Sequence, residues 1–294
     1  MCSCACCAKK KDMPHLLSLN LNHFRCYEQA QLNNLNAGLI VIAGANGAGK
    51  TNILEAVSLL SPGRGLRGAK PLEIQRQNSP EAWAVSSEIH QDFAPVRVGT
   101  GLDSRTEKRI IRINGVNAKA QSALADYMAC LWLTPQMDGL FLQGASERRR
   151  FLDRLVFTFD PGHSGRLARY ENALRQRSKL LQTGQGEPSW LQGLEAQMAE
   201  TGTAIAAARL DFVERLQAAC NQSVEGDFPM ARLSVAGTIE ELLGQSPALE
   251  VEEMFAYQLS ESRARDSETG GAATGPHKSD LKRDISTQNQ CQLH

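Results

Sequence analysis

Eight consecutive residues have the types and spacing needed to hold the phosphates of a nucleotide: Gly44, Ala45, Asn46, Gly47, Ala48, Gly49, Lys50 and Thr51. They match the pattern G-x-x-x-x-G-K-[ST], in which the glycines let consecutive backbone N–H groups turn towards phosphate oxygens. Lys50 would reach the β- and γ-phosphates and is the candidate catalytic residue, and the Thr51 hydroxyl would bind Mg²⁺. The segment therefore predicts a P-loop site for ATP and Mg²⁺.

The flanking elements must place this loop. Residues 39–43 are apolar and largely β-branched, which predicts a buried strand, and residues 52–60 have apolar spacing typical of a helix. A strand, a glycine turn and a helix in this order direct the N-terminus of the helix at the phosphates.

Elsewhere the pattern predicts an α/β protein. Alternating residues and an Asn114-Gly115 hairpin signal precede a change to helical spacing, which runs from 146 to about 220. Two helices with a break at 183–188 predict a short antiparallel hairpin. Further strands are expected at 16–21, 27–32, 82–90, 96–102, 108–113, 129–133 and 230–236, and further helices at 118–127 and 250–263.

Composition indicates a soluble globular protein, with 42% apolar and 22% charged residues among 294. No apolar run is long enough to span a membrane, and no signal peptide is visible. The net charge is zero but unevenly placed: residues 146–182 hold nine Lys and Arg against four Asp and Glu, and residues 183–266 hold five against fourteen. The basic segment either contacts nucleic-acid phosphates or is a solvated helix face.

The eight cysteines do not indicate a disulfide framework. Four crowd together at Cys2, Cys4, Cys6 and Cys7, and the others are scattered as free thiols in a reducing compartment would be. Residues 1–12 are expected to be an extension outside the fold, with Met13 as the possible true start. A thiolate cluster that binds a soft metal is the alternative.

Several separated motifs resemble the RecF family of recombination-repair ATPases, which are related to SMC and ABC-type heads. Residues 19–27 are similar to its opening L-x-N-F-R-x-Y, and residues 49–56 to its G-K-T-N-x-L-E-A. Residues 133–135 and 144–153 resemble the P-x-x-R-R-x-F-L-D stretch, and residues 275–281 resemble G-P-H-R-x-D-L with Lys278 in place of arginine. The likeness runs from about Met13 to Leu281.

The resemblance implies an ABC-type P-loop ATPase head with an inserted helical hairpin lobe. We expect a nucleotide-binding lobe at 13–143, a helical lobe at 144–227 and an incomplete return to the ATPase lobe at 228–294. It also implies ATP-dependent dimerisation, binding to gapped or double-stranded DNA, co-operation with RecO and RecR, and a cytoplasmic role in DNA repair, replication and the SOS response to DNA damage. Within the basic segment, the DNA-binding candidates are Arg148, Arg149, Arg150 and Arg166.

Two parts of the family's hydrolytic machinery are not recognisable in this sequence: an acidic strand that holds Mg²⁺, and a serine- and glycine-rich signature loop. Residues 156–160 end in an aspartate, but they lie among helical segments, and Thr183–Gly186 has the composition of a turn. Gln136 could sense Mg²⁺ or simply lie on the surface. We therefore expect a truncated relative that hydrolyses ATP slowly and exposes an apolar sheet edge.

Two other functions remain open. One is a P-loop small-molecule kinase, for which Arg64 and Arg67 in the glycine-rich loop would form an arginine lid. The other is a remnant that binds nucleotide without hydrolysing it. The helical hairpin and the segment 275–281 argue against the kinase.

Overall fold

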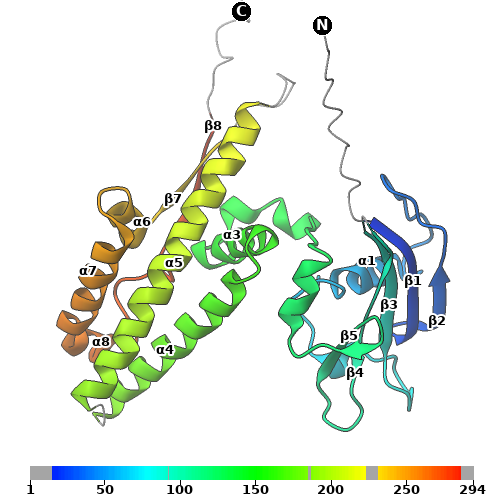
Figure 1. Ribbon diagram of the computed structural model, residues 1–294, viewed down its shortest axis with the longest axis horizontal. Helices are drawn as coiled ribbons and strands as arrows, with labels where there is room; N and C mark the ends of the chain where they lie inside the picture. Colours follow the sequence, from blue (N-terminus) through cyan, green and yellow to red (C-terminus); the bar gives the residue numbers. More distant parts are fainter. Residues whose placement is uncertain (1–14, 92, 185–186, 223–230, 286–294) are drawn as a thin grey trace, which may run out of the picture. The chain divides into compact units, whose positions relative to one another are not determined.

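The computed structural model describes residues 15–91, 93–184, 187–222 and 231–285. The chain forms two compact units, Met1–Trp132 and Leu133–His294, each with its own core (Figure 1). The division falls before the expected one at residue 143. Residues 231–285 belong to the same unit as the preceding helices, because β7 packs on α5 and β8 packs on α3.

The first unit is built on a six-stranded sheet in the order β2-β1-β3-β4-β5-β6. All five neighbouring pairs are antiparallel. Asn114 and Gly115 both have positive φ, at 50° and 84°, in the turn between β5 and β6, as the sequence predicted. The strands are β1 (His15–Phe24), β2 (Tyr27–Leu32), β3 (Ala84–His90), β4 (Val96–Leu102), β5 (Arg109–Ile113) and β6 (Val116–Asn117).

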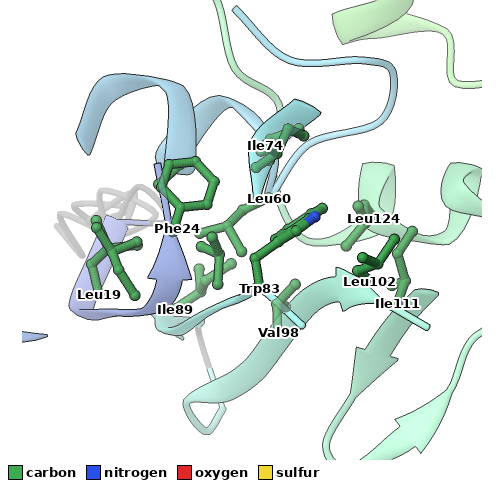
Figure 2. Close-up of a cluster of buried hydrophobic side chains, with 14 residues drawn as sticks. Leu19, Phe24, Leu60, Ile74, Trp83, Ile89, Val98, Leu102, Ile111 and Leu124 are labelled. Carbon is green, nitrogen blue, oxygen red and sulfur yellow. The ribbon is translucent and has the colours of Figure 1, made fainter. Parts of the chain in front are cut away.

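Helix α1 (Lys50–Ser58) lies against this sheet, followed by the single-turn helix α2 (Pro71–Ile74) and the 3₁₀ helix η1 (Gln121–Asp126). The sheet and helices enclose an apolar core, shown in Figure 2. Trp83 lies in it with its indole N–H satisfied by the carbonyl of Pro71 at 2.7 Å. Its other buried members include Leu19, Leu21, Phe24, Leu59, Leu60, Ile74, Ile89 and Val98.

Two expected strands are wrong. Residues 39–43 and 129–133 are in neither strand nor helix. Instead of being buried, residues Leu39 and Val41 are 93% and 77% exposed, and Leu133 is 81% exposed. A buried strand requires a neighbour to accept and donate its backbone hydrogen bonds. The described sheets offer these runs no partner strand, so their apolar character does not produce a strand.

The second unit is mainly helical. Helices α4 (His163–Thr183) and α5 (Pro188–Asn221) form the expected hairpin, and α5 also packs on α7 (Ala248–Glu261) (Figure 1). The antiparallel pair β7 (Ala231–Ala236) and β8 (Asp280–Ile285) completes the unit. The remaining elements are α3 (Ala145–Phe159), α6 (Thr238–Leu243), α8 (Arg263–Thr269), η2 (Pro135–Met137) and η3 (Leu140–Leu142).

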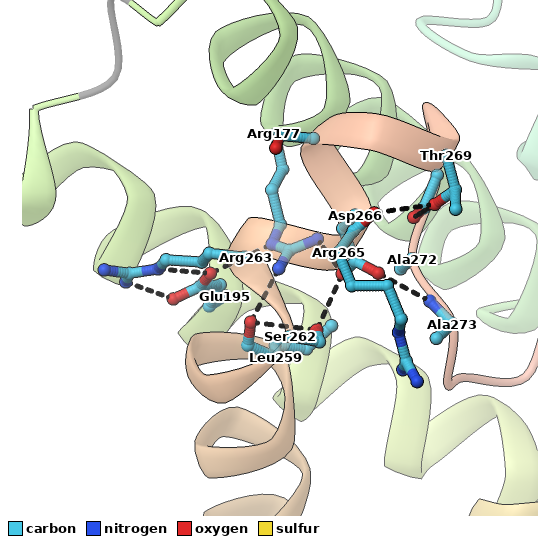
Figure 3. A network of polar contacts seen from close by, with 12 residues as sticks. Arg177, Glu195, Leu259, Ser262, Arg263, Arg265, Asp266, Thr269, Ala272 and Ala273 are labelled. Carbon is cyan, nitrogen blue, oxygen red and sulfur yellow. Dashed lines mark hydrogen bonds and ion pairs between the residues drawn. The ribbon is translucent and has the colours of Figure 1, made fainter.

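A buried polar network joins the helices of this unit (Figure 3). Arg177 on α4 is fully buried and donates to Glu195 on α5 at 2.9 Å and to Asp266 on α8 at 2.8 Å. Its third donor reaches the carbonyl of Leu259 at the end of α7. Arg263 donates to the same carboxylate of Glu195. Arg177 breaks the apolar stripe of α4 because it serves as the hub of this network.

Among the described residues, no helix combines the length and apolar character needed to cross a membrane. No group of three or more His, Cys, Asp or Glu in the same residues could hold a metal ion. The N-terminal cysteines, and the thiolate cluster considered for them, lie outside the described residues.

Candidate functional site

The glycine loop is bent as a phosphate cradle requires. Gly47 and Gly49 have φ of 83° and 91°, the left-handed region that favours glycine, and α1 begins at Lys50 directly after them. The first amides of α1 therefore lie at the loop, where the positive end of the helix dipole attracts an anion. Thr51 follows on the exposed first turn of α1. The predicted site residues are thus brought together, although the strand expected before them is not formed.

Lys50 turns back over the loop. Its Nζ donates to the carbonyl oxygens of Gly44 and Ala45, each at 2.7 Å. Both acceptors are neutral, and a charged phosphate oxygen is a stronger partner for an ammonium group. The donor set of N–H groups, an ammonium and a hydroxyl fits a triphosphate with Mg²⁺.

The turn between β1 and β2 packs against the glycine loop. A Cβ at Gly49 would lie 2.6 Å from the Tyr27 hydroxyl and 2.8 Å from the Cys26 thiol, so any other residue there would displace these two side chains. The amide of Asn52 on α1 donates to the same thiol at 3.0 Å. Burial, followed by the neighbouring Cys26, raises the pKa of Tyr27. In the sequence, residues 26 and 27 are recognisable as part of the opening family motif. Nothing there indicates that they contact the glycine loop, which only the structure shows.

A buried carboxylate ties α1 to two arginines. Glu55 is 1% exposed and accepts both a 2.9 Å and a 2.6 Å hydrogen bond from Arg25, as well as one from Arg67. Arg67 also donates to Asn52 at 2.9 Å. The glycine-rich loop therefore places one cation beside α1, with 40% of its side chain exposed. The kinase hypothesis assigned Arg67 to a lid over the phosphates. In the structure, the contacts of Arg67 with Glu55 and Asn52 explain its position without such a lid.

In the second unit, Arg148 and Arg149 both hold the segment 275–281. Arg148 donates to the two carboxylate oxygens of Asp280 at 2.6 and 2.9 Å. Arg149 donates to the carbonyl of Ser279 at 2.7 Å. The bonds from Arg148 lower the pKa of Asp280 to about 2. Two of the four arginines predicted to contact DNA therefore have structural partners inside the unit.

The other two candidates pair with nearby acidic residues. Arg150 pairs with Glu147 at 2.8 Å, and 72% of its side chain is exposed. Arg166 is less accessible, with 23% of its side chain exposed, and donates to Asp160 beyond the C-terminus of α3. The exposed pair at Arg150 contributes little to stability and leaves that cation available to other anions. Contact of these side chains with DNA stays a prediction.

The segment 275–281 is anchored by several buried groups. The Nε2–H of His277 donates to the carbonyl of Ala272 at 3.0 Å, so Nδ1 accepts the Tyr170 hydroxyl at 2.7 Å. Burial lowers the pKa of this imidazole, and Lys278 and Arg149 add to the shift, whereas the bond to Ala272 opposes it. Arg209 donates to the carbonyl of Pro276 at 2.7 Å. This part of the family motif fixes a turn in the second unit.

Three weaker candidates have ordinary places in this unit. Residues 156–159 belong to α3 and Asp160 follows its end, so they form no acidic strand, as expected. Thr183 ends α4 at the hairpin turn, of which residues 185–186 lie outside the described residues. Gln136 lies on the exposed 3₁₀ helix η2, where its carbonyl accepts Gln143 at 3.1 Å. A Mg²⁺-sensing role for Gln136 stays a prediction.

One family model and many curated proteins match this chain. An AAA domain model matches residues 18–81, which include the glycine loop. The chain is 44% identical over 275 residues to the DNA replication and repair protein RecF of Rhizobium rhizogenes, and the match covers 92% of this chain and 73% of that protein. It is 42% identical to that of Rhizobium meliloti, again with 92% and 73% coverage.

Solved structures extend the agreement to the fold. The structure of the recombination mediator protein RecF-ATPrS in the RecFOR pathway matches with a TM-score of 0.84 and 24% identity. The match covers 94% of this chain and 74% of that chain. The RecF-ATP structure of the same pathway gives a TM-score of 0.82 at 23% identity. On the sequence relatives and the motifs described above, this chain belongs to the RecF family.

Proposed function

We propose that this chain is a cytoplasmic ATP- and DNA-binding protein of recombinational DNA repair and replication. The observation that carries the proposal is the left-handed glycine turn at residues 47 and 49, which ends at Lys50 and the N-terminus of α1. Gly44 to Thr51 would hold the triphosphate, and Thr51 would bind Mg²⁺. Mg²⁺ held there would neutralise negative charge that develops on the phosphates, and Lys50 would orient the β- and γ-phosphates.

The further elements of the proposal come from the family. Relatives named for DNA replication and repair, and solved structures placed in the RecFOR pathway, support binding to gapped or double-stranded DNA. The name of that pathway also supports RecO- and RecR-like partners. Membership of the RecF family supports nucleotide-dependent dimerisation. The accessible cations of the second unit, such as Arg150, are suitable for phosphate contacts.

Calorimetry with ATP and Mg²⁺ tests the nucleotide site. Lys50→Ala should weaken ATP binding by roughly ten- to hundredfold, because it removes a charged hydrogen-bond donor from the phosphates. The control is Lys282→Ala, an exposed lysine of the second unit that pairs with Asp280. Equal ATP affinity in the wild type and the Lys50 variant would refute the site.

Binding of wild-type protein to gapped duplex DNA, measured by fluorescence anisotropy with ATP and Mg²⁺ present, tests the DNA part of the proposal separately.

A further inference from the structure

A hollow of about 360 Å³ lies in the second unit, between the C-terminal half of α4 and residues 270–278. Its rim carries three cations, Arg175 and Lys179 from α4 and Lys278 from the family segment, and no carboxylate lines it. Gly270, with φ of 76°, allows the loop to approach the Gln182 amide closely, since a Cβ there would lie 2.7 Å from Nε2. The loop and the helix thus bring cations that are distant in sequence to one opening.

The three cations differ from the other arginines of this region. Arg148, Arg166 and Arg177 all have carboxylate partners, whereas no ion pair is found for Arg175, Lys179 or Lys278 within the described residues. All three side chains are exposed. His277 also lines the hollow, but both of its ring nitrogens are hydrogen-bonded, to Tyr170 and to Ala272. It therefore adds no positive charge to the hollow. The rim is therefore a positive surface whose charges can meet an external anion.

The chemistry of the hollow favours a polyanion over a small anion. Small phosphates are usually held by backbone N–H groups at a helix N-terminus, but α4 ends here at Thr183 and turns its negative dipole end to this side. The charge that attracts an anion to the rim therefore comes from the three cationic side chains. Arg175 and Lys179 are four residues apart, which places them about 6 Å apart along the helix axis. This distance is close to the length of duplex axis that two successive phosphates of one strand occupy, about 7 Å. No Phe, Tyr or Trp lines the hollow, so bases have no stacking surface.

We propose that Arg175, Lys179 and Lys278 form a binding site for the backbone phosphates of DNA. The inference rests on the proposed function, because it assumes that the protein binds DNA. It assigns the contact to the rim of this hollow instead of to Arg148 and Arg149, whose guanidinium groups are occupied. Binding through these cations is independent of base sequence and depends strongly on salt.

The test measures the affinity of the full chain, with ATP and Mg²⁺, for a fluorescent gapped duplex between 50 and 200 mM salt, roughly the range over which binding to phosphates weakens most clearly. The variant carries Arg175→Gln, Lys179→Gln and Lys278→Gln. The matched control is Arg215→Gln, an exposed arginine near the C-terminal end of α5 that pairs with Asp211. ATP affinity and the thermal midpoint of both variants show that the fold is retained.

Removing one phosphate-binding cation should lower the slope of log affinity against log salt by about 1, so the slope should fall by about 3 in the triple variant and stay unchanged in the control. An unchanged slope in the triple variant, with wild-type protein binding DNA, would overturn this inference alone. Absence of DNA binding by wild-type protein would overturn the proposed DNA function as well. Displacement of DNA by millimolar inorganic phosphate at constant ionic strength, seen in the wild type and absent in the triple variant, would indicate a small-anion pocket and also refute the proposal.

Discussion

The guanidinium of Arg148 donates two hydrogen bonds to the carboxylate of Asp280, 2.6 Å from Nε to Oδ1 and 2.9 Å from Nη2 to Oδ2. This two-pronged geometry is the strongest that arginine makes with a carboxylate. It joins α3 to the start of β8, which are 132 residues apart in the sequence. Two family motifs that are separate in the sequence are thus parts of one structural connection.

This pair predicts an acid-sensitive second unit. The pKa of Asp280 is about 2 in the folded protein against 3.8 for an unperturbed aspartate, so the pair contributes fully above pH 4 and its contribution disappears as the pH falls towards 2. The free energy of unfolding, measured by urea titration at several pH values, should therefore decrease over that range. Asp280→Asn should be less stable at pH 7 and should show a smaller decrease between pH 4 and 2. A decrease of the same size in this variant would contradict the assignment.

Arg177 should be among the most sensitive positions of the second unit. Removing its side chain leaves the buried carboxylates of Glu195 and Asp266 without their shared cation. Arg177→Met should lower the free energy of unfolding by about 3–5 kcal/mol. The exposed Arg215, paired with Asp211, provides the control, and Arg215→Met should cost at most about 1 kcal/mol. Similar losses in the two variants would show that the network contributes little.

The glycine loop allows a matched pair of substitutions. Gly47 and Gly49 both have left-handed φ, so alanine at either position costs about 1–2 kcal/mol of backbone strain. Only at Gly49 would the new Cβ also meet Tyr27 and Cys26, whereas nothing lies within 4 Å of a Cβ at Gly47. Gly49→Ala should therefore reduce the thermal midpoint and the ATP affinity more than Gly47→Ala. The reverse order would mean that the β1–β2 turn does not support the loop.

The Mg²⁺ contribution should depend on Thr51. Thr51→Ala should lower ATP affinity when Mg²⁺ is present and leave it unchanged when EDTA is present, because only the metal-bound state uses the hydroxyl. The measurement is calorimetry with ATP in the two conditions. An equal loss of ATP affinity with Mg²⁺ and with EDTA would show that the hydroxyl does not act through the metal.

Local patterns predicted most of the first unit. The strand at 96–102 and the strand at 27–32 have the predicted bounds, because alternation and turn residues specify them within a few positions. The glycine motif likewise carries its own geometry. Both features depend on neighbours in the sequence, so they can be recognised without knowledge of the tertiary fold.

The remaining features depend on contacts between distant segments. The ion pair between Arg25 and Glu55, and that between Arg148 and Asp280, join residues whose spacing carries no periodic signal. Strand β8 is recognisable in the sequence only as a family motif, since its pairing with β7 spans many residues. The apolar run at 39–43 failed as a strand for the opposite reason. Its residue types are suitable, but strand formation requires a partner that local sequence does not reveal.

That same run should make the chain prone to self-association. Leu39, Ile40 and Val41 are 93%, 49% and 77% exposed, an unusual density of apolar side chains in consecutive positions. An extended apolar segment with free backbone groups can pair with another copy. Leu39→Lys combined with Val41→Lys should reduce both the fluorescence of bound ANS and the aggregated fraction in light scattering. The control is Leu249→Lys, which changes a single 69%-exposed leucine on α7 and should have little effect. If the double variant binds as much dye and aggregates as readily as the wild type, the run is not the surface through which copies associate.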